Sequence, residues 1–383
     1  MESSAPKILE PNGPSRVVCA MSGGVDSSVA AALLKEQGHE VVGLFMRNGI
    51  QPAAAAARGK QGCCSLDDAA DARRVAGILD IPFYAVDFSG DFQTIIEGFA
   101  DEYERGRTPN PCIRCNKLLK FGRLIDHADR LGAEFVATGH YGQVVQANDR
   151  LSVRRSVDLT KDQSYVLFSL DQAQLSRTLL PLGNLEKTQV RALAKQFNLP
   201  VDDKPDSQEI CFVPDNNYSG LLERLRPGTV NEGDMVDTDG VVVGRHGGHQ
   251  QFTIGQRKGI GGGFREPRYV VAIDAPNNQV VIGKRDELLC GGLTMREVTF
   301  SGLLTSDLDE GVDGLIQIRY QQEPMKATAT RIIDGEVEVL FHSPFPSVTP
   351  GQAAVFYVGE DIGFGGYIEE ARPPSRRPSE KAL

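Results

Sequence analysis

The chain has 383 residues, of which 40% are hydrophobic and 24% charged, and it contains no Trp. This length corresponds to two or three domains, so a small single-core module is excluded. No run of about 18 uninterrupted apolar residues is present, and we therefore predict no membrane-spanning segment. The first 14 residues have neither the basic segment nor the apolar segment of an export signal, which favours a cytoplasmic protein.

The charge and the cysteines narrow the class of protein. With 41 basic and 51 acidic residues the formal net charge is −10, which excludes the uniformly cationic surface of non-specific nucleic-acid binders. A polyanionic partner must therefore bind a local basic patch. Seven cysteines, an odd number, argue against a disulfide framework and favour reduced thiols, some with chemical roles.

The first half of the chain alternates between strand and helix patterns. Short apolar runs predict buried strands at 16–21, 40–46, 82–88 and 134–138. Amphipathic or Ala-rich segments predict helices at 25–37, 65–79, 91–103, 116–131 and 187–197. This alternation predicts an α/β fold with a doubly wound parallel sheet, whose ligand site lies at the carboxyl ends of the strands. The Ala-rich segment 51–61 is interpreted as a mobile loop.

Beyond about residue 218 the pattern becomes all-β, with short alternating segments separated by turn residues. We predict a small central domain followed by a C-terminal β-barrel. The predicted division is a flexible tail at 1–15, a catalytic domain at 16–218, the central domain at 219–284, the barrel at 285–372 and a disordered tail at 373–383.

The motif SGGVDSS, residues 22–28, stands where the first predicted strand meets the first predicted helix. At such a junction backbone N–H groups and the positive end of the helix dipole converge on an anion. Gly23 and Gly24 allow a tight turn and close approach of phosphate, while Ser27 and Ser28 are expected to supply hydroxyl donors. A simple glycine turn with serine caps is the alternative. The complete motif in this place favours phosphate binding, and its pattern differs from the P-loop of kinases and GTPases.

Two cysteine motifs are candidates for chemistry. Cys112 and Cys115 have C-x-x-C spacing directly before a predicted helix, beside Arg114, so we expect a lowered pKa for at least one thiol. Cys211, in DSQEICF, forms the second motif. Cys19 and Cys290 are expected to be buried and inert. No function is assigned to the adjacent pair Cys63 and Cys64.

These motifs resemble those of a known family. SGGVDSS resembles the loop of the N-type ATP pyrophosphatases (the PP-loop superfamily), which cleave ATP between the α and β phosphates and adenylate a substrate oxygen. TPNPCIRCNKLLKF, ATGHY, KDQSYVL, SQEICF and GQRKGIG, in this order, are similar to the tRNA-specific 2-thiouridylase family (MnmA, or TrmU), in register from Arg16 to about Tyr367. The resemblance implies that ATP activates the C2 oxygen of the wobble uridine of tRNA and that a cysteine persulfide delivers sulfur.

The resemblance also implies roles for individual residues. Cys115 matches the nucleophile and Cys211 the persulfide carrier. The implied ATP contacts are Ala20, Met21, Ser22, Gly23, Gly24, Val25, Asp26, Ser27, Met46 and Gly139. The implied tRNA contacts are Asn110, Pro111, Cys112, His140, Lys161, Asp162, Gln163, Arg319, Tyr320 and Gln352. We expect Asp26 to position Mg²⁺ on the leaving pyrophosphate, although a carboxylate in the first turn also suits the helix dipole.

One position departs from the family pattern, because many relatives carry Asp where this chain has Cys112. The change creates the C-x-x-C pair and adds a third thiol to Cys115 and Cys211. Three cysteines can ligate a [4Fe–4S] cluster with one open iron site, as in related cluster-dependent RNA thiolases. The cluster is therefore an alternative to plain redox chemistry of the C-x-x-C pair.

Basic residues gather beside the first cysteine motif. Residues 105–123 include six basic residues and no acidic one, and 245–268 include five basic residues, one acidic residue and two histidines. Such runs are commonly solvated faces, but their coincidence with the cysteines favours tRNA binding. We expect the target base to be extruded into the site. His140 is interpreted as a substrate contact, since no second histidine stands at metal-ligand spacing.

We predict an ATP-dependent tRNA-uridine 2-sulfurtransferase that uses ATP with Mg²⁺, tRNA, and a sulfur donor such as a cysteine desulfurase or a sulfur-relay protein. The alternatives are a cluster-dependent RNA thiolase, another PP-loop adenylating synthetase, and a non-catalytic RNA- or nucleotide-binding module with a decayed site. No glutaminase cysteine–histidine arrangement is apparent, which disfavours an amidotransferase-fed synthetase. The intact SGGVDSS motif, with Cys115 and Cys211, disfavours decay.

Overall fold

A computed structural model describes residues 6–49, 66–147, 149–205, 210–213, 217–261, 264–331 and 335–374. The loop predicted at 51–61, Cys63 and Cys64 lie outside these ranges, as do residues 1–5 and 375–383 of the predicted tails. Part of the N-terminal segment predicted as flexible is a strand, β1 (Lys7–Ile8), which pairs with β6 (Gln143–Ala147). The sequence prediction missed it because two residues carry too short a pattern.

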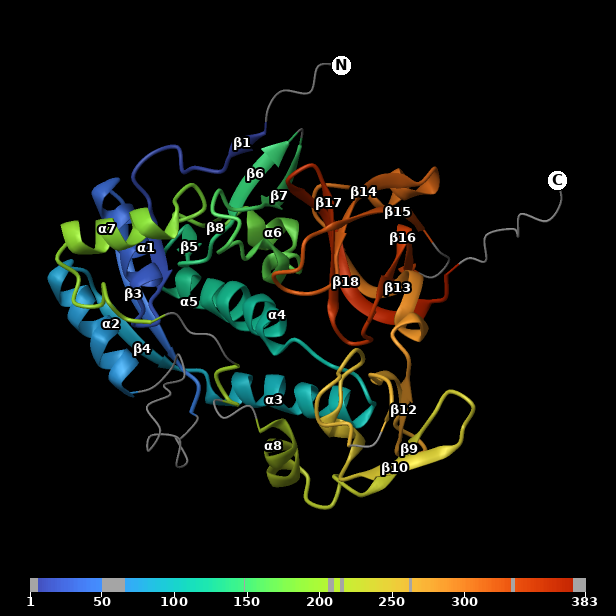
Figure 1. Ribbon diagram of the computed structural model, residues 1–383. Coiled ribbons are helices and arrows are strands. Elements are labelled where there is room, and N and C mark those ends of the chain that lie inside the picture. The colour runs from blue at the N-terminus through green and yellow to red at the C-terminus, as the bar shows by residue number, and fades with distance from the viewer. Residues whose placement is uncertain are drawn as a thin grey trace.

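A five-stranded parallel sheet organises the first half of the chain (Figure 1). Its strands stand in the order β4 (Phe83–Asp87), β3 (Glu40–Arg47), β2 (Arg16–Ala20), β5 (Phe135–Ala137) and β8 (Thr178–Leu179). All four neighbouring pairs are parallel. The chain runs outward from β2 in both directions, so the strand order switches between β2 and β5 and a crevice opens at their carboxyl ends. The predicted doubly wound fold is confirmed.

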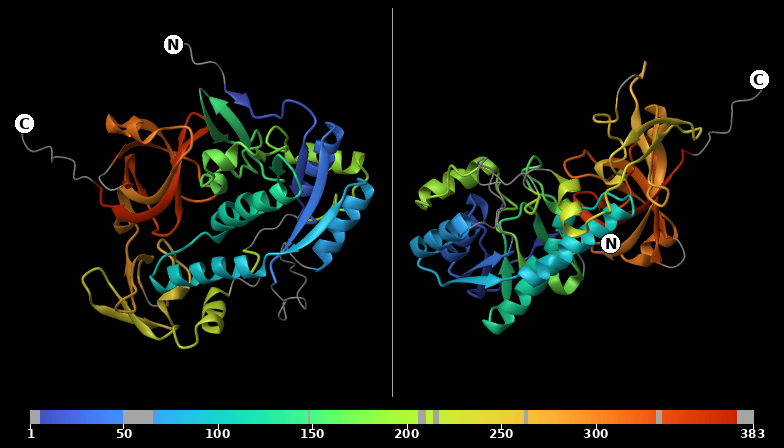
Figure 2. Two further views of the ribbon diagram at one scale, coloured as in Figure 1. Left: turned by 180° about the vertical axis from the view of Figure 1, so that it is seen from behind. Right: turned by 90° about the horizontal axis from the view of Figure 1, so that it is seen from below.

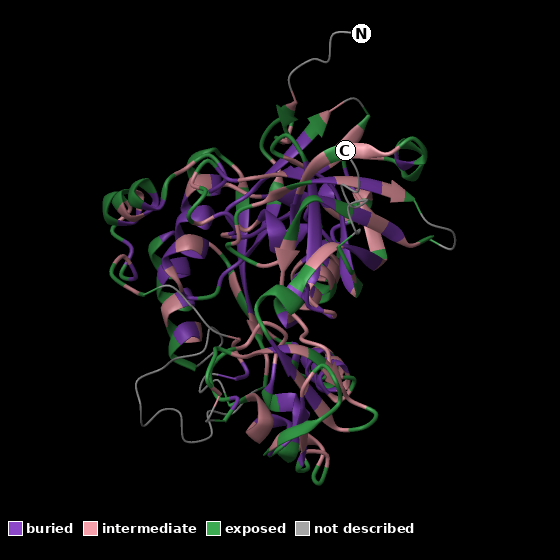
Figure 3. Ribbon diagram, turned by 45° about the vertical axis from the view of Figure 1, so that its right-hand side comes forward, coloured by how far each residue is buried: buried purple, intermediate pink, exposed green. Residues whose placement is uncertain are grey.

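Helices cover both faces of this sheet. One face packs against α1 (Val25–Glu36), α2 (Leu66–Ile78) and α7 (Lys187–Gln196). The other packs against α3 (Ser89–Glu104), α4 (Pro111–Cys115), the π-helix η2 (Asn116–Arg123) and α5 (Leu124–Arg130). Alternate residues of β2 enter the two cores, Val17 with the first and Val18 with the second. Figure 3 shows this buried interior between exposed outer helix surfaces.

A closed barrel forms the C-terminal part. Its strands are β13 (Leu289–Phe300), β14 (Val312–Gln317), β15 (Met325–Arg331), β16 (Val337–Pro346), β17 (Ala353–Val358) and β18 (Asp361–Arg372). They pair in the order β18-β13-β16-β15-β14-β17, and β17 pairs back with β18, which closes the barrel. Closure removes the exposed sheet edges. The predicted barrel is confirmed.

A hairpin from the first half joins this barrel. Strand β7 (Arg150–Arg154), the partner of β6, pairs with β18 through Arg154 and Asp361, whose side chains also form an ion pair of 2.6 Å. The sheet order therefore continues from the barrel through β7 and β6 to β1. Sequence patterns did not predict this hairpin, and it ties the α/β part to the barrel.

A smaller sheet lies between these two parts in the chain. It contains β9 (Gly233–Val236), β10 (Val242–His246), β11 (Tyr269–Asp274) and β12 (Gln279–Gly283) in the order β10-β9-β12-β11. Helix α8 (Tyr218–Leu225) leads into it, and Arg226 at its end pairs with Asp101 and Glu104 of α3. Figure 2 shows the far end of α3 reaching this unit.

The remaining helices are short: η3 (Ser164–Leu167), α6 (Gln172–Leu175), η4 (His249–Gln251), η5 (Asp286–Leu288) and η6 (Thr305–Asp309). Across the described ranges, none of the helices has both the length and the apolar character needed to cross a bilayer.

Candidate active site

A pocket of about 420 Å³ opens at the carboxyl edge of the parallel sheet, where the strand order switches. Nine of the ten residues predicted to contact ATP line it: Ala20, Met21, Ser22, Gly24, Val25, Asp26, Ser27, Met46 and Gly139. The tenth, Gly23, supports the loop from behind. Its φ is +74°, and a Cβ there would lie 2.2 Å from the carbonyl oxygen of Asp68, so only glycine fits.

Two serines organise the loop that precedes α1. The backbone N–H of Ser22 donates to Ser27 Oγ (3.1 Å), and that hydroxyl also contacts Ser22 Oγ at 3.2 Å. Ser27 Oγ also donates to the carbonyl of Gly24 at 3.2 Å, and the fully buried Ser28 donates to the same carbonyl at 2.8 Å. The expectation that Ser28 offers a hydroxyl to phosphate is therefore wrong, because the helical turn directs its side chain back into α1.

The loop after β5 lies directly against the first turn of α1. A Cβ on Gly139 would come within 2.6 Å of the Ser27 nitrogen, so a larger residue would push the two loops apart. Glycine at this position lets the two sides of the crevice meet, which explains how a residue so distant in sequence joins the phosphate loop.

Two lysines that sequence reasoning did not identify line the pocket. Lys187 Nζ lies 2.8 Å from each carboxylate oxygen of Asp26, which also accepts a hydrogen bond of 2.8 Å from the Tyr141 hydroxyl. Lys204 Nζ contacts Asp68 at 2.7 Å and Asp71 at 2.8 Å, and donates to the Gly23 carbonyl at 3.0 Å. Both lysines follow the phosphate motif by more than 150 residues, so no local signal marked them.

His140 lies in the wall of the same pocket and is only 7% exposed. Its Nδ1 is 2.7 Å from Thr138 Oγ1, and its Nε2 is 3.3 Å from Lys120 Nζ. Burial, with a smaller contribution from the charge of Lys120, lowers the pKa of His140 well below its usual value. The ring is therefore neutral at pH 7. Because an ammonium group only donates, Nε2 accepts from Lys120 and Nδ1 carries the proton.

The two cysteine motifs lie close to this pocket along the chain. Cys115 ends α4, five residues before pocket-lining Lys120, and Cys211 follows pocket-lining Pro205 by six residues. Cys115 and Cys211 are partly buried and pack against the same hydrophobic core, the one on the α3 side of the sheet. Cys112 is exposed, and its backbone N–H donates to the side chain of Asn110, which caps α4.

The thiols do not form a cluster site in this conformation. In the part of the chain that the structure describes, which includes Cys112, Cys115 and Cys211, no three Cys, His, Asp or Glu side chains are grouped so as to hold a metal ion. A [4Fe–4S] cluster needs at least three such ligands converging on it. Among the described residues, Cys112, Cys115 and Cys211 are not grouped in this way.

The cysteines expected to be inert have high thiol pKa values. Burial raises the pKa of Cys19 to about 12 and also raises that of Cys290. Neither thiol is activated as a thiolate near neutral pH. Cys19 is buried as predicted, whereas Cys290 is only partly buried.

Comparison with known proteins covers all three parts of the chain. Residues 15–215 match the family model described as tRNA methyl transferase HUP domain, 222–284 the tRNA methyl transferase PRC-barrel domain, and 292–368 the aminomethyltransferase beta-barrel domain. The chain is 48% identical over 360 residues to tRNA-specific 2-thiouridylase MnmA of Geobacter metallireducens, covering 93% of this chain and 97% of the relative. The chain belongs to the tRNA-specific 2-thiouridylase (MnmA) family.

Other MnmA relatives are similar over comparable lengths. Identity is 46% to the MnmA of Rhodopirellula baltica, with 93% of this chain and 97% of the relative covered. It is also 46% to the MnmA of Carboxydothermus hydrogenoformans, with 94% and 98% covered. The similarity to MnmA therefore extends over the α/β part, the central sheet and the barrel together.

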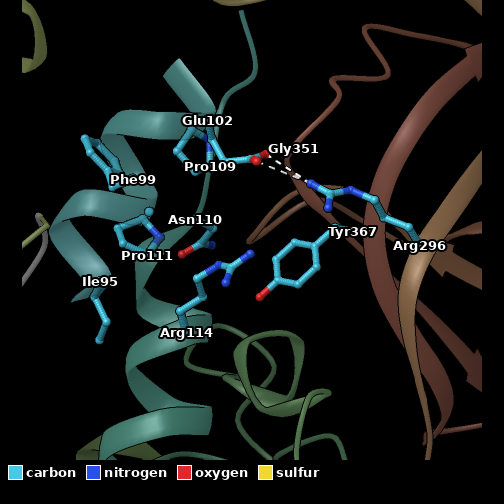
Figure 4. A pocket seen from close by; sticks show the side chains of 11 residues that line it. Ile95, Phe99, Glu102, Pro109, Asn110, Pro111, Arg114, Arg296, Gly351 and Tyr367 are labelled. Atoms are coloured by element: carbon cyan, nitrogen blue, oxygen red, sulfur yellow. Dashed lines mark hydrogen bonds and ion pairs between the residues drawn. The ribbon is translucent and has the colours of Figure 1, made fainter. Parts of the chain in front are cut away.

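Six of the ten residues predicted to contact tRNA line one of two pockets. His140, Lys161, Gln163 and Tyr320 line the nucleotide pocket. Asn110 and Pro111 line a second, smaller pocket between α3, α4 and the barrel (Figure 4). In that pocket the guanidinium of Arg114 lies over the ring of Tyr367, 5.4 Å from its centre.

Three other residues predicted to contact tRNA make contacts within the protein. Asp162 is buried, pairs with Arg155 at 3.1 Å and accepts the backbone N–H groups of Ser156 and Ser164. Arg319 donates to the backbone carbonyls of Ile254 and Ser347 and to Thr349 Oγ1. Gln352 donates to the Thr108 carbonyl at 2.7 Å. These side chains fix the loops on which they lie.

The basic run of 105–123 is less cationic in three dimensions than in sequence. Among the described residues, at least four of its six basic residues form ion pairs with carboxylates: Arg105, Arg107, Arg114 and Arg123. Arg245 of the second basic window pairs with Glu232 and Asp234. Counting charge along the sequence overstated the cationic surface, because acidic partners come from other elements.

Proposed function

We propose that this chain is a tRNA-uridine 2-sulfurtransferase, which adenylates the C2 oxygen of the wobble uridine and replaces that oxygen with sulfur. The observation that carries the proposal is the joint placement of a phosphate-loop pocket and two cysteine motifs. Cys115 and Cys211 pack against one core, and each lies within six residues of a side chain in the pocket wall. This placement suits a reaction that needs ATP and thiols at a single base.

The first step consumes ATP. The uridine oxygen attacks the α phosphorus, a bond from that oxygen to phosphorus forms, and the bond to the β-phosphate bridge breaks and releases pyrophosphate. The N–H groups of the loop at 22–28 and Lys187 and Lys204 face the phosphates. Mg²⁺, when bound to the phosphates, would offset their charge. Asp26 fits as its protein ligand, because its carboxylate lines the pocket and its salt-bridge partner Lys187 can pair with phosphate instead.

The second step transfers sulfur. A donor such as a cysteine desulfurase or a sulfur-relay protein loads Cys211 as a persulfide, whose terminal sulfur attacks C2 of the uridine. The C2–O bond breaks and AMP leaves with the oxygen. The Cys115 thiolate then attacks Cys211 Sγ, which forms a disulfide between the two cysteines and releases 2-thiouridine. A dithiol reductant restores both thiols. No step requires a cluster.

The tRNA contacts are also part of the proposal. Asn110, Pro111 and Cys112 would contact the target base. Lys161, Gln163 and Tyr320 would contact the tRNA nucleotide that enters the larger pocket. Asp162, Arg319 and Gln352 would act through the loops that they hold. We propose a cytoplasmic enzyme with the catalytic domain at 16–218, the central domain at 219–284 and the barrel at 285–372.

Nucleoside mass spectrometry of tRNA tests this function. Unmodified tRNA is incubated with the protein, ATP, Mg²⁺, a cysteine desulfurase with cysteine, and a dithiol reductant. We expect 2-thiouridine at the wobble position, with one AMP and one pyrophosphate released for each thiolated base. Asp26→Asn should abolish pyrophosphate release and leave tRNA affinity nearly unchanged, whereas Asp80→Asn, the same change on the surface, should be neutral. Methylated uridine formed from S-adenosylmethionine, with no thiolation, would contradict the proposal.

A further inference from the structure

Lys120 enters the nucleotide pocket from a helical segment of unusual register. The π-helix η2 continues α4 directly after Cys115. Its hydrogen bonds join residues five apart, so a side chain five positions along returns to nearly the same side. In an α-helix, with 3.6 residues per turn, it would lie nearly opposite. The π register therefore turns Lys120 toward the side on which Cys115 lies.

Contacts from outside the helix stabilise this register. Gln174 Nε2 donates to the carbonyl of Lys117 at 3.1 Å and to that of Phe121 at 2.8 Å. Gly122 permits the close approach of the Lys117 carbonyl, because a Cβ there would lie 3.0 Å from that oxygen. Single-turn π segments occur frequently at functional sites. The position of Lys120 is thus built into the fold, since Gln174 and Gly122 both support the register.

His140 aims the side chain of Lys120. The neutral ring accepts from the ammonium group at 3.3 Å and is itself held by Thr138 at 2.7 Å. This contact fixes the direction of the ammonium group without cancelling its positive charge. Lys187 and Lys204, in the same pocket, contact carboxylates. The direction of the Lys120 ammonium group is set in part by an imidazole in the pocket wall.

We propose that Lys120 is a catalytic residue that stabilises negative charge at the α phosphate, and that His140 is the positioning residue that aims it. The inference rests on the proposed function. In the first step, as the uridine oxygen bonds to phosphorus and pyrophosphate departs, negative charge spreads over the non-bridging oxygens of the α phosphate. In the second step, negative charge gathers on AMP when sulfur displaces AMP from C2. A fixed cation beside the α phosphate lowers the activation barriers of adenylation and of sulfur transfer, because its side chain does not have to reorient during the reaction. Lys120 transfers no proton in either step.

The test is single-turnover kinetics on Lys120→Met, following pyrophosphate release and 2-thiouridine formation separately. We expect the rate of pyrophosphate release to fall about 100-fold or more, with the KM for ATP changed less than about 3-fold. Lys120→Arg keeps a cation and should recover part of the rate. Lys195→Met, the same change at an exposed position of α7, is the matched control and should behave as wild type.

A double-variant cycle tests the role of His140. His140→Leu removes the acceptor and should lower the rate about 10-fold, while His140→Gln offers a carbonyl oxygen to Lys120 and should recover part of it. Combined with Lys120→Met, His140→Leu should cause no further loss, because the two residues act as one unit. Additive losses, or a wild-type rate in Lys120→Met, would overturn the inference. If the unaltered protein forms no 2-thiouridine, it is the proposed function that fails.

Discussion

His140 shows how burial gives one residue a measurable effect on stability. In the unfolded chain a histidine has a pKa of about 6.5, and in the folded protein burial lowers the pKa of His140 well below this value. Between the two pKa values the unfolded chain binds a proton that the folded protein does not. The free energy of unfolding must therefore fall as the pH drops below about 6.5. Burial also lowers the pKa of His127 and His246, which adds to the same effect.

We predict a lower urea midpoint at pH 5 than at pH 7.5, and a weaker pH dependence in His140→Gln. The carboxylates whose pKa values are lowered in the folded protein, such as Asp158 and Glu369, titrate at lower pH, so the interval from about 5 to 6.5 isolates the histidines. Urea unfolding followed by circular dichroism at closely spaced pH values measures the effect. An unchanged pH dependence in the variant would show that His140 is charged in the folded state.

At the scale of elements, the segment 116–131 separates what a sequence pattern predicts from what it does not. The prediction of a helix there is confirmed by η2 and α5. The sequence pattern did not predict the π register of η2. Periodicity reports which residues are apolar, and it does not report Gln174, whose side chain binds the carbonyls of Lys117 and Phe121 from another helix. The register is therefore a tertiary property.

We predict that Gly122→Ala destabilises the protein by about 1–2 kcal/mol, since the added methyl crowds the Lys117 carbonyl. It should also slow pyrophosphate release, because Lys120 lies on the same π-helix. Gly77→Ala in α2 is the matched control: it is exposed, and a Cβ there meets nothing within 4 Å. This control should gain up to about 1 kcal/mol from helix propensity. Thermal melts of both variants provide the measurement, and equal stability of the two would contradict the steric argument.

At the scale of the whole molecule, a ring of alternating charges joins the α/β part to the barrel. Arg107 pairs with Glu369 (2.9 Å), Glu369 with Arg296 (2.6 Å), Arg296 with Glu102 (3.3 Å) and Glu102 with Arg107 (3.9 Å). Figure 4 shows the contact of Glu102 with Arg296 beside the smaller pocket. The Thr108 carbonyl is held by Gln352 of the barrel. These contacts orient the segment that leads into α4 and its cysteines.

Removing one charge from this ring should loosen that orientation. Glu369→Gln leaves two arginines sharing Glu102, and we expect a loss of about 1–3 kcal/mol in the free energy of unfolding. We also expect a raised KM for tRNA with unchanged ATP affinity, because the barrel no longer holds the segment before α4. Glu310→Gln, at an exposed position of the barrel, is the control. Urea unfolding and tRNA-dependent kinetics measure the two effects, and an unchanged KM for tRNA would show that the ring serves stability alone.

The sequence by itself determined the features that depend on neighbouring residues. The parallel α/β sheet follows from local periodicity, the phosphate loop from a contiguous motif at a strand–helix junction, and the barrel from short alternating segments. Nine of the ten residues predicted to contact ATP line one pocket, but that set was drawn from the family resemblance and stays a prediction. The roles of Cys115 and Cys211 stay predictions, drawn from motifs that resemble a family.

Only the tertiary structure decided the features that join residues far apart in the chain. Lys187 reaches Asp26 across 161 positions, and Arg107 reaches Glu369 across 262. The neutralisation of the basic run, the π register of η2 and the joining of β7 to the barrel have the same origin. The physical reason is that each depends on side-chain or strand contacts formed when separate elements pack together, and a local pattern records the character of a residue but not its partner.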